Sequence, residues 1–255
     1  MTRPFRFAAV LALLAAAPAA ADTVFVAGAT GRTGQGIVRE LVAQGFDVIA
    51  LTRDASRAPP DLGSGVRWVT GDVRDIDSLR AGMAGADVVV SAIGARQGRG
   101  PNSPEFVDFA GTRNLVDAAK ENGVRQFVLI ASGRTGPHID HTTHRNMGYT
   151  RHFKTKGEEH LKASGVPYTI LGAAGLIEQG KAPMGIRLFS RADYAATTQS
   201  TDETVVIAIP DIAQVVAAAL RDPAARNKAF AVMNDANRPR DGWRGEFAAT
   251  SPAWP

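Results

Sequence analysis

Three glycines spaced three residues apart could hold the phosphates of a nucleotide. Gly28, Gly31 and Gly34 follow the apolar run 23–27, and a segment with helical periodicity begins within the same loop. Glycines permit a tight turn and a close approach of the backbone, and the helix start presents free N–H groups to an anion. The residues that we expect to contact a dinucleotide here are Gly28, Thr30, Gly31, Arg32, Thr33 and Gly34.

Two arginines near the end of the second expected strand bear on the choice of dinucleotide. Sites that prefer NAD place a carboxylate at this point, where it binds the ribose 2′-hydroxyl. Arg53 and Arg57 could instead pair with a 2′-phosphate, because the planar guanidinium fork suits phosphate oxygens. Asp54 would favour NAD if its side chain, rather than that of Arg53, reached the ribose. The sequence therefore favours NADP(H), with NAD as the alternative.

Strands and helices alternate along the part of the chain that must position these residues. Strands are expected at residues 23–27, 47–51, 66–70, 87–91, 126–130 and 168–171, and helices at residues 32–43, 76–83, 105–122 and 156–164. This alternation predicts an α/β fold with a Rossmann-type doubly wound parallel sheet. Beyond residue 175 the periodicity weakens, apart from a helix at 212–220 and a strand at 229–233. We expect a single NAD(P)-binding domain over residues 22–255, with a small C-terminal substrate lobe from about residue 175.

The glycine spacing resembles the loop of the extended and atypical short-chain dehydrogenase/reductase family. The segment 154–170, which reads KTKGEEHLKASGVPYTI, is similar to the atypical branch that includes NAD(P)H-binding, NmrA-like and flavin or biliverdin-IXβ reductase proteins. The resemblance is closest over residues 23–171. It implies further cofactor contacts from Asp72 and Val73 near the adenine, from Ser91, Ala92, Ile93 and Gly94 after the fourth strand, and from Ser132 after the fifth.

The catalytic pattern of that family is altered in this chain. Classical members use a serine together with the pattern Tyr-x-x-x-Lys, in which the lysine holds the ribose and lowers the tyrosine pKa. Here Tyr149 and Lys154 are one residue too far apart, and Phe153 stands at the lysine position. Either Lys154 binds the nicotinamide ribose without Tyr149, or a local bulge restores the pair. The candidate catalytic residues are therefore Ser132, Tyr149 and Lys154.

A second departure follows the sixth expected strand. Related chains often continue from Thr-Ile into Arg-Pro-Gly-Gly, whereas here Ile170 is followed by Leu171 and Gly172. Any contact that the arginine makes in relatives must be absent or replaced. Flavin-reductase-like members need no tyrosine and lysine pair, because orientation of donor and acceptor supplies much of the rate.

Three histidines gather in the loop that follows the fifth strand. His138, His141 and His144 are three residues apart, a spacing that could suit zinc. Neither cysteine nor a second carboxylate cluster supports such a site. We therefore expect a polar loop without a metal; a proton donor for the substrate from one of these histidines is the other role left open.

The N-terminal segment has the pattern of a secretory signal peptide. Arg3 and Arg6 precede the apolar run 7–17, and small residues follow up to Ala21. The run is too short for a permanent membrane span, so we expect cleavage after Ala21, at the end of residues 1–21, and no stable membrane span afterwards. The mature protein would be periplasmic or secreted, or cytoplasmic if the segment is not a signal. Export conflicts with the expected cofactor, because free NADPH should be scarce outside the cytosol.

These features predict an NAD(P)H-dependent oxidoreductase that transfers hydride to a small carbonyl, quinone or flavin-like acceptor. The altered tyrosine and lysine spacing favours an alternative, a non-catalytic NADP(H)-binding sensor or assembly protein. A sugar-nucleotide epimerase or dehydratase is a third reading, which the short C-terminal portion disfavours. The 29 Lys and Arg and 25 Asp and Glu are scattered, so the expected partner is a small molecule and not a nucleic acid. The absence of cysteine excludes disulfides and thiol catalysis. The sequence does not indicate an oligomeric state.

Overall fold

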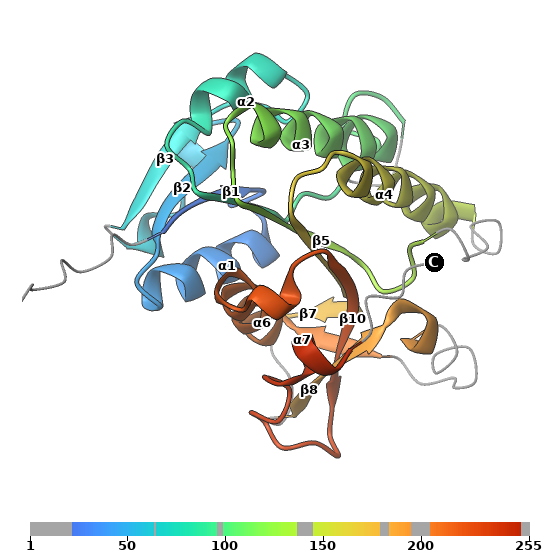
Figure 1. The fold of residues 1–255 in the computed structure, drawn as a ribbon. Helices are drawn as coiled ribbons and strands as arrows, with labels where there is room; N and C mark the ends of the chain where they lie inside the picture. The colour runs from blue at the N-terminus through green and yellow to red at the C-terminus, as the bar shows by residue number, and fades with distance from the viewer. Residues whose placement is uncertain are drawn as a thin grey trace, which may run out of the picture.

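Eight strands of the described residues form one sheet in a computed structural model of the chain, in the order β3-β2-β1-β4-β5-β6-β10-β8 (Figure 1). The structure describes residues 22–63, 65–95, 99–136, 145–178, 184–194 and 205–250. The strands are β1 (Thr23–Ala27), β2 (Asp47–Thr52), β3 (Val66–Thr70), β4 (Val88–Ser91), β5 (Gln126–Ser132), β6 (Tyr168–Ala173), β8 (Gly185–Ser190) and β10 (Lys228–Asp235). All neighbours are parallel except β8, which runs antiparallel to β10. The expected Rossmann-type α/β fold is confirmed.

Helices cover both faces of the sheet (Figure 1). They are α1 (Arg32–Ala43), α2 (Ile76–Gly82), α3 (Thr112–Glu121), α4 (Arg145–Ala163) and α6 (Ile209–Arg221). The first and last of these pack together on one face, and α2, α3 and α4 lie on the other. The buried side chains divide in the same way, with Ile37 and Ile212 in one cluster and Leu115 and Leu161 in the second. Burial on both faces explains why β4 is almost wholly apolar.

The strand order reverses at the middle of the sheet, beside β1. This strand pairs in parallel with β2 on one side and with β4 on the other, so that Ala27 lies in register with Ser91. In open α/β sheets, the crevice outside the carboxyl ends of the strands at such a switch point is where ligands bind. The glycine loop leaves β1 at this crevice, and residues 92–95 leave β4 at the same place.

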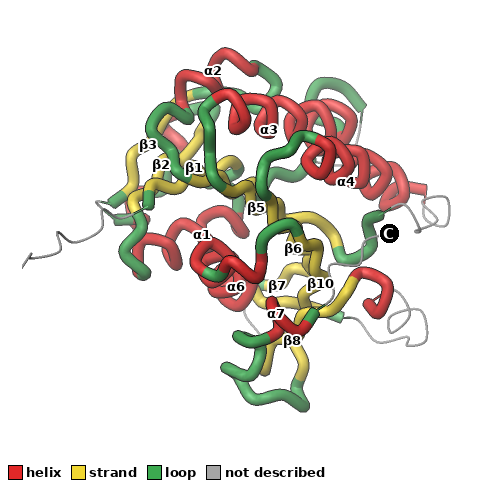
Figure 2. Tube along the Cα trace, viewed as in Figure 1, coloured by secondary structure: helices red, strands yellow, loops and turns green. Residues whose placement is uncertain are grey.

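The C-terminal portion extends the sheet instead of forming only a separate lobe. β8 joins the main sheet, while β7 (Gly175–Ile177) and β9 (Val206–Ala208) form a two-stranded parallel sheet. The weak periodicity here has a physical cause, because two of the three strands are only three residues long and β8 is almost entirely buried. The short helix α7 (Glu246–Ala249) lies against β8, close to β10 (Figure 2). Its Phe247 ring packs edge-on against Phe230, with centroids 5.3 Å apart.

Two helices differ from the sequence expectation. α4 begins at Arg145, well before residue 156, because its first turns carry polar residues that give no apolar periodicity. The segment Glu105–Gly111 is π-helical and leads directly into α3. Such π-helical turns inside helices occur frequently at functional sites. Asp108, which forms an ion pair with Lys154, lies in this segment.

None of the helices in the described ranges is long and apolar enough to cross a membrane. Residues 1–21, which contain the expected signal peptide, lie outside the described residues.

Candidate dinucleotide-binding site

The loop between β1 and α1 has a geometry that requires glycine at two positions. Gly28 has a φ of 84°, and a Cβ on it would lie 2.6 Å from the carbonyl oxygen of Ala92. A Cβ on Gly34 would collide with the carbonyl oxygen of Gly28, which also accepts a 3.0 Å hydrogen bond from the Gly31 amide. The turn therefore brings β1, α1 and the end of β4 into direct backbone contact. Side chains at these positions would disrupt the turn, which has the glycine pattern of loops that admit a pyrophosphate.

The N-terminus of α1 opens into this loop. Gly31 is its N-cap residue, makes no side-chain cap hydrogen bond, and is followed by a first turn without an acidic residue. The first amides of a helix have no partners within the helix, and the helix dipole is positive at this end. The loop and the helix together fit the phosphates of a dinucleotide.

A cavity of about 420 Å³ lies at the carboxyl ends of the strands next to the glycine loop. The sequence-predicted residues that line it are Gly28, Thr30, Gly31, Arg53, Arg57, Asp72, Val73, Ala92, Ile93 and Gly94. The predicted residues outside its lining are Arg32, Thr33, Gly34, Ser91, Ser132, Tyr149 and Lys154. Lining residues that the sequence analysis did not single out are Leu51, Thr52, Gly71, Arg74, Ala95, Asn102 and Val107.

Three arginines and one aspartate line the cavity: Arg53, Arg57, Arg74 and Asp72, of which Arg74 and Asp72 form an ion pair. Asp54, the residue that would favour NAD, does not line the cavity. Its carboxylate accepts hydrogen bonds from the amide and hydroxyl of Ser56 at 2.9 and 2.7 Å. These bonds from Ser56 hold the pKa of Asp54 below its ordinary value and keep its charge in the adjoining turn. The carboxylate that could have bound a ribose hydroxyl from this position is therefore not part of the cavity lining.

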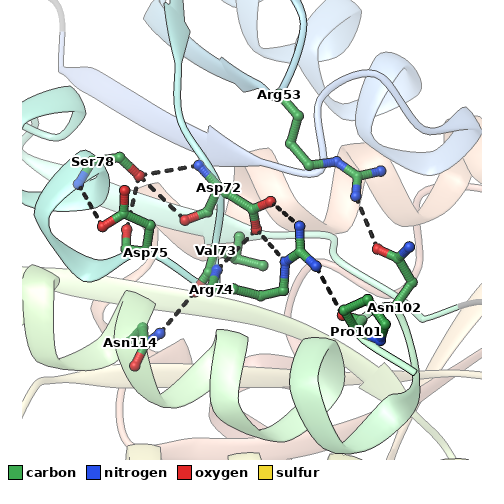
Figure 3. Close-up of polar contacts among 9 residues, drawn as sticks. All are labelled: Arg53, Asp72, Val73, Arg74, Asp75, Ser78, Pro101, Asn102 and Asn114. Carbon is green, nitrogen blue, oxygen red and sulfur yellow. Dashed lines mark hydrogen bonds and ion pairs between the residues drawn. The ribbon is translucent and has the colours of Figure 1, made fainter. Parts of the chain in front are cut away.

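Arg74 is the arginine that the sequence analysis missed. Its guanidinium binds the Asp72 carboxylate through Nε at 2.9 Å and Nη2 at 2.5 Å (Figure 3). The same guanidinium donates to the carbonyl of Pro101 at 3.1 Å, and Arg53 donates to the Asn102 side chain at 3.1 Å. The two arginines thus attach the segment after β4 to the cavity wall. A basic residue two positions after the Gly-Asp pair is the signal that could have identified it.

Asp72 is fixed from both its backbone and its side chain. Its amide donates to the Ser78 hydroxyl at 3.1 Å, and Val73 accepts from the Asn114 amide at 3.0 Å (Figure 3). Hydrogen bonds from Arg74 hold the pKa of the Asp72 carboxyl below its ordinary value. An ionised carboxylate at this place could accept a hydrogen bond from an adenine amino group.

A buried ion pair lies at the other end of the cavity. Lys154 Nζ is 2.8 Å from Asp108 Oδ1, and the Asp108 side chain is fully buried. The same ammonium donates to the Ile93 carbonyl at 3.4 Å, so it reaches the chain segment that lines the cavity. α4 packs closely here, since a Cβ on Gly157 would lie 2.9 Å from the Asp108 carbonyl oxygen. The sequence did not indicate Asp108, which lies in a different helix from Lys154.

The structure does not bring Tyr149 and Lys154 together. α4 is continuous from Arg145 to Ala163, and at about 100° per residue a five-residue step separates two side chains by about 140° around the helix. Tyr149 is 44% exposed and packs edge-on against Phe153, with ring centroids 4.9 Å apart. The local bulge that would restore the pair is not present, because the helix is regular at this point.

Ser132 ends β5 and anchors the turn that follows it. Its hydroxyl accepts from the Arg134 amide at 3.2 Å, and its carbonyl accepts from the Thr135 hydroxyl at 2.7 Å. The fully buried Ser91 hydroxyl has no hydrogen-bond partner among the described residues. Because β5 is the parallel neighbour of β4, Ser132 lies at the same edge of the sheet as the cavity, one strand beyond the lining residues that follow β4.

An arginine from the C-terminal portion fills the space beside Gly172. Arg191 donates to the Ser132 carbonyl and to Glu158 Oε1, the latter at 3.1 Å, and both members of this ion pair are buried. A Cβ on Gly172 would collide with the Arg191 guanidinium. The arginine that relatives carry after Thr-Ile is thus absent from β6, and a guanidinium from beyond β8 occupies the neighbouring space. No sequence pattern linked these two positions.

Metal binding finds no support in the part of the chain that the structure describes. Within it, no group of three or more His, Cys, Asp or Glu side chains is arranged to hold a metal ion. The cluster of His138, His141 and His144 lies outside the described residues.

Comparison with known proteins identifies the family. Residues 28–223 match the NAD(P)H-binding family. Sanguinarine reductase from Eschscholzia californica is 31% identical over 248 residues, covering 82% of this chain and 87% of that protein. The chloroplastic protein At2g34460 from Arabidopsis thaliana is 37% identical over 164 residues, which are 60% of this chain and 59% of that protein. Among solved structures, a putative NAD-dependent epimerase/dehydratase from Bacillus halodurans superposes with a TM-score of 0.71 at 22% identity, covering 89% of this chain and 99% of that one. This match agrees with the resemblance to atypical short-chain dehydrogenase/reductase proteins that the spacing of the glycine loop indicates. The chain therefore belongs to the NAD(P)H-binding family.

Proposed function

We propose that this protein is an NADP(H)-dependent reductase of a small carbonyl, quinone or flavin-like acceptor. The observation that carries the proposal is the cavity itself, which joins a glycine loop at a helix N-terminus to a wall bearing three arginines. The Gly28 and Gly34 backbone would hold the pyrophosphate, and Arg53 and Arg57 would hold the 2′-phosphate, while Arg74 stays paired with Asp72. When bound, NADPH supplies a hydride, and reduction of a carbonyl or quinone also takes up one proton.

Lys154 and Ser132 are the residues that we propose at the reacting end. The Asp108 carboxylate fixes the Lys154 ammonium next to the Ile93 carbonyl, where the ammonium can donate to the hydroxyls of the nicotinamide ribose. The Ser132 hydroxyl, at the end of the neighbouring strand, can donate to an acceptor oxygen. Tyr149 has no part in this arrangement, because its ring packs on Phe153.

The cofactor preference is tested by titrating NADPH and NADH against the wild-type protein and Arg53→Gln, following nicotinamide fluorescence. A charge-assisted bond to phosphate contributes about 1.5–3 kcal/mol, so the NADPH Kd should rise about 10- to 100-fold while the NADH Kd changes less than about twofold. Arg39→Gln is the matched control, since this exposed arginine pairs with Asp61 away from the cavity. Equal affinity of the wild type for both cofactors would refute the preference.

Turnover is tested by following NADPH oxidation with menadione, FMN and an aromatic aldehyde. Consumption that requires both protein and acceptor supports the reductase. The altered tyrosine and lysine spacing favours one alternative, a non-catalytic NADP(H)-binding sensor or assembly protein. Tight NADPH binding without oxidation by any of these acceptors would favour that alternative.

We also propose that residues 1–21 direct export, so that the mature protein acts in the periplasm or outside the cell. The proposal rests on the basic, apolar and small-residue pattern that ends at Ala21. N-terminal sequencing of the protein purified from its native cells tests it. A chain that begins at Asp22 is expected, and an intact Met1 in the cytosolic fraction would refute the proposal.

A further inference from the structure

Two half-buried arginines lie close in the chain to Ser132 and Lys154 and are not used by the proposed cofactor contacts. They are Arg134 and Arg151, and no carboxylate of the described residues forms an ion pair with either. The Nε atom of Arg151 is fully buried and has no hydrogen-bond partner within the same residues. A buried guanidinium nitrogen without an acceptor is costly unless a ligand supplies one.

Chain position places both arginines next to the residues that would face the acceptor. Arg134 follows Ser132 by two residues, and its amide donates to the Ser132 hydroxyl at 3.2 Å. Arg151 lies three residues before Lys154 on α4, and side chains three apart are neighbours on a helix surface. Arg134 is therefore adjacent to Ser132, and Arg151 lies about one helical turn from Lys154.

A buried tyrosine, Tyr194, forms a cluster with Arg134, Arg151 and Arg191. Tyr194 is 2% exposed, and a Cβ on Gly133 would lie 2.6 Å from its Cε1 and 3.1 Å from its hydroxyl. Burial raises the pKa of the Tyr194 phenol, while Arg134, Arg191 and Arg151 act in the opposite direction, Arg134 also through a hydrogen bond. The Tyr194 ring therefore lies against Gly133, with its phenol hydrogen-bonded to Arg134.

Two of the three guanidinium groups form no ion pair within the described ranges. Arg191 is paired with Glu158 at 3.1 Å, whereas Arg134 and Arg151 have no carboxylate partner among those residues. Burial lowers the pKa of Arg151, and the nearby guanidinium of Arg134 lowers it further. An anion between Arg134 and Arg151 would relieve both effects, because it neutralises like charges and accepts from buried donors.

We propose that Arg134 and Arg151 bind an oxyanion on the substrate, so that the natural acceptor is an organic acid bearing a carboxylate, sulfonate or phosphate group. The inference rests on the proposed reductase function and deepens it by naming the class of substrate. Because residue 133 is a glycine, the Tyr194 ring can pack directly against the backbone there, and Arg191 keeps its ion pair with Glu158. The remote anionic group would fix the acceptor against the cofactor, which is how orientation raises a rate.

The test compares two acceptors that differ in one charged group, 1,2-naphthoquinone-4-sulfonate and 1,2-naphthoquinone. NADPH oxidation is measured for the wild type, Arg134→Gln, Arg151→Gln and the matched control Arg226→Gln, an exposed arginine just before β10. Loss of one charge-assisted contact should lower kcat/KM for the sulfonate about 10- to 100-fold, mainly through KM. The neutral quinone should change less than about twofold in the same variants, and the NADPH Kd should stay constant.

Equal losses for both quinones, or no loss for the sulfonate, would overturn the anion site while leaving the reductase intact. If neither quinone is reduced although NADPH binds, the reductase proposal fails by itself. Calorimetric titration of the NADP-loaded protein with the sulfonate then decides the anion site independently. A Kd for the sulfonate that rises at least tenfold in Arg134→Gln and Arg151→Gln, but not in Arg226→Gln, supports the site. An unchanged Kd in Arg134→Gln and Arg151→Gln refutes it.

Discussion

Replacement of Asp108 by Asn removes one charge from the buried pair with Lys154 while keeping the shape of the side chain. Asp108 is fully buried and Lys154 is 20% exposed, so the ammonium would lose its counter-ion in a place that water reaches poorly. Removing one partner of a buried pair costs about 3–5 kcal/mol, and the partial exposure of Lys154 reduces this to about 2–3 kcal/mol. For a chain of this size the melting temperature should then fall by about 4–12 °C.

Asp117→Asn provides the control for this prediction. Asp117 pairs with His160 across 2.7 Å, but both side chains are about one-third exposed. Exposed pairs contribute about 0–1 kcal/mol, so this variant should melt within about 3 °C of the wild type. Thermal unfolding by circular dichroism compares the two variants. An Asp108→Asn protein as stable as Asp117→Asn would refute the reasoning.

A double-mutant cycle separates the ion pair from other effects. Lys154→Met together with Asp108→Asn removes both charges, and the double variant should be more stable than Asp108→Asn alone. The NADPH Kd should nevertheless rise in both proteins, because the ammonium beside Ile93 is displaced in one and missing in the other. Additive losses of stability would show that the pair has no coupling.

Other perturbations test the remaining parts of the site. Gly34→Ala should abolish NADPH binding, measured by fluorescence, because the new Cβ meets the loop backbone. Hydrogen bonds lower the pKa of Asp72 from its ordinary 3.8, so these bonds stabilise the fold above pH 3.8, and this stabilisation is lost as the pH falls through the lowered pKa. Arg74→Gln removes the main hydrogen-bond donor. The difference in unfolding free energy between pH 7 and pH 3, measured by urea titration, should therefore become smaller in this variant. Arg191→Met leaves a buried carboxylate unpaired and should cost about 3–5 kcal/mol of unfolding free energy by the same assay. Tyr149→Phe should leave NADPH oxidation within about twofold of the wild type, since Tyr149 does not line the cavity and its ring packs on Phe153.

The parts of the site that the sequence revealed are those built by short stretches of chain. Gly28 and Gly34 could be identified because the turn, the helix start and the preceding strand are contiguous, so the physical requirement is local. The alternation of strands and helices likewise predicted the parallel sheet, because each strand–helix–strand unit is contained within about 30 residues. The strand at 229–233 was predicted and corresponds to β10, whereas β7 and β9 were missed because three residues are too few to show a period.

Contacts between distant segments left no such pattern. Asp108 pairs with Lys154 only because the π-helical segment and α4 pack closely at Gly157. Arg191 reaches Ser132 across the sheet edge from beyond β8. These pairings depend on tertiary packing, and a single sequence contains no periodicity that relates them.

The partner of Lys154 determines which chemistry the site can perform. In the Tyr-x-x-x-Lys pattern the lysine lowers the pKa of a phenol that donates the proton, but here the ammonium is held by Asp108 and the phenol of Tyr149 lies elsewhere. A site without that proton donor suits acceptors such as quinones and flavins, whose reduced forms can take their proton from water. Rate then depends on how well the acceptor is oriented, and orientation comes from groups remote from the reacting atoms. The arginine pair of Arg134 and Arg151 supplies such a group, so its removal should impair turnover of an acidic acceptor more than the loss of the Tyr149 hydroxyl does.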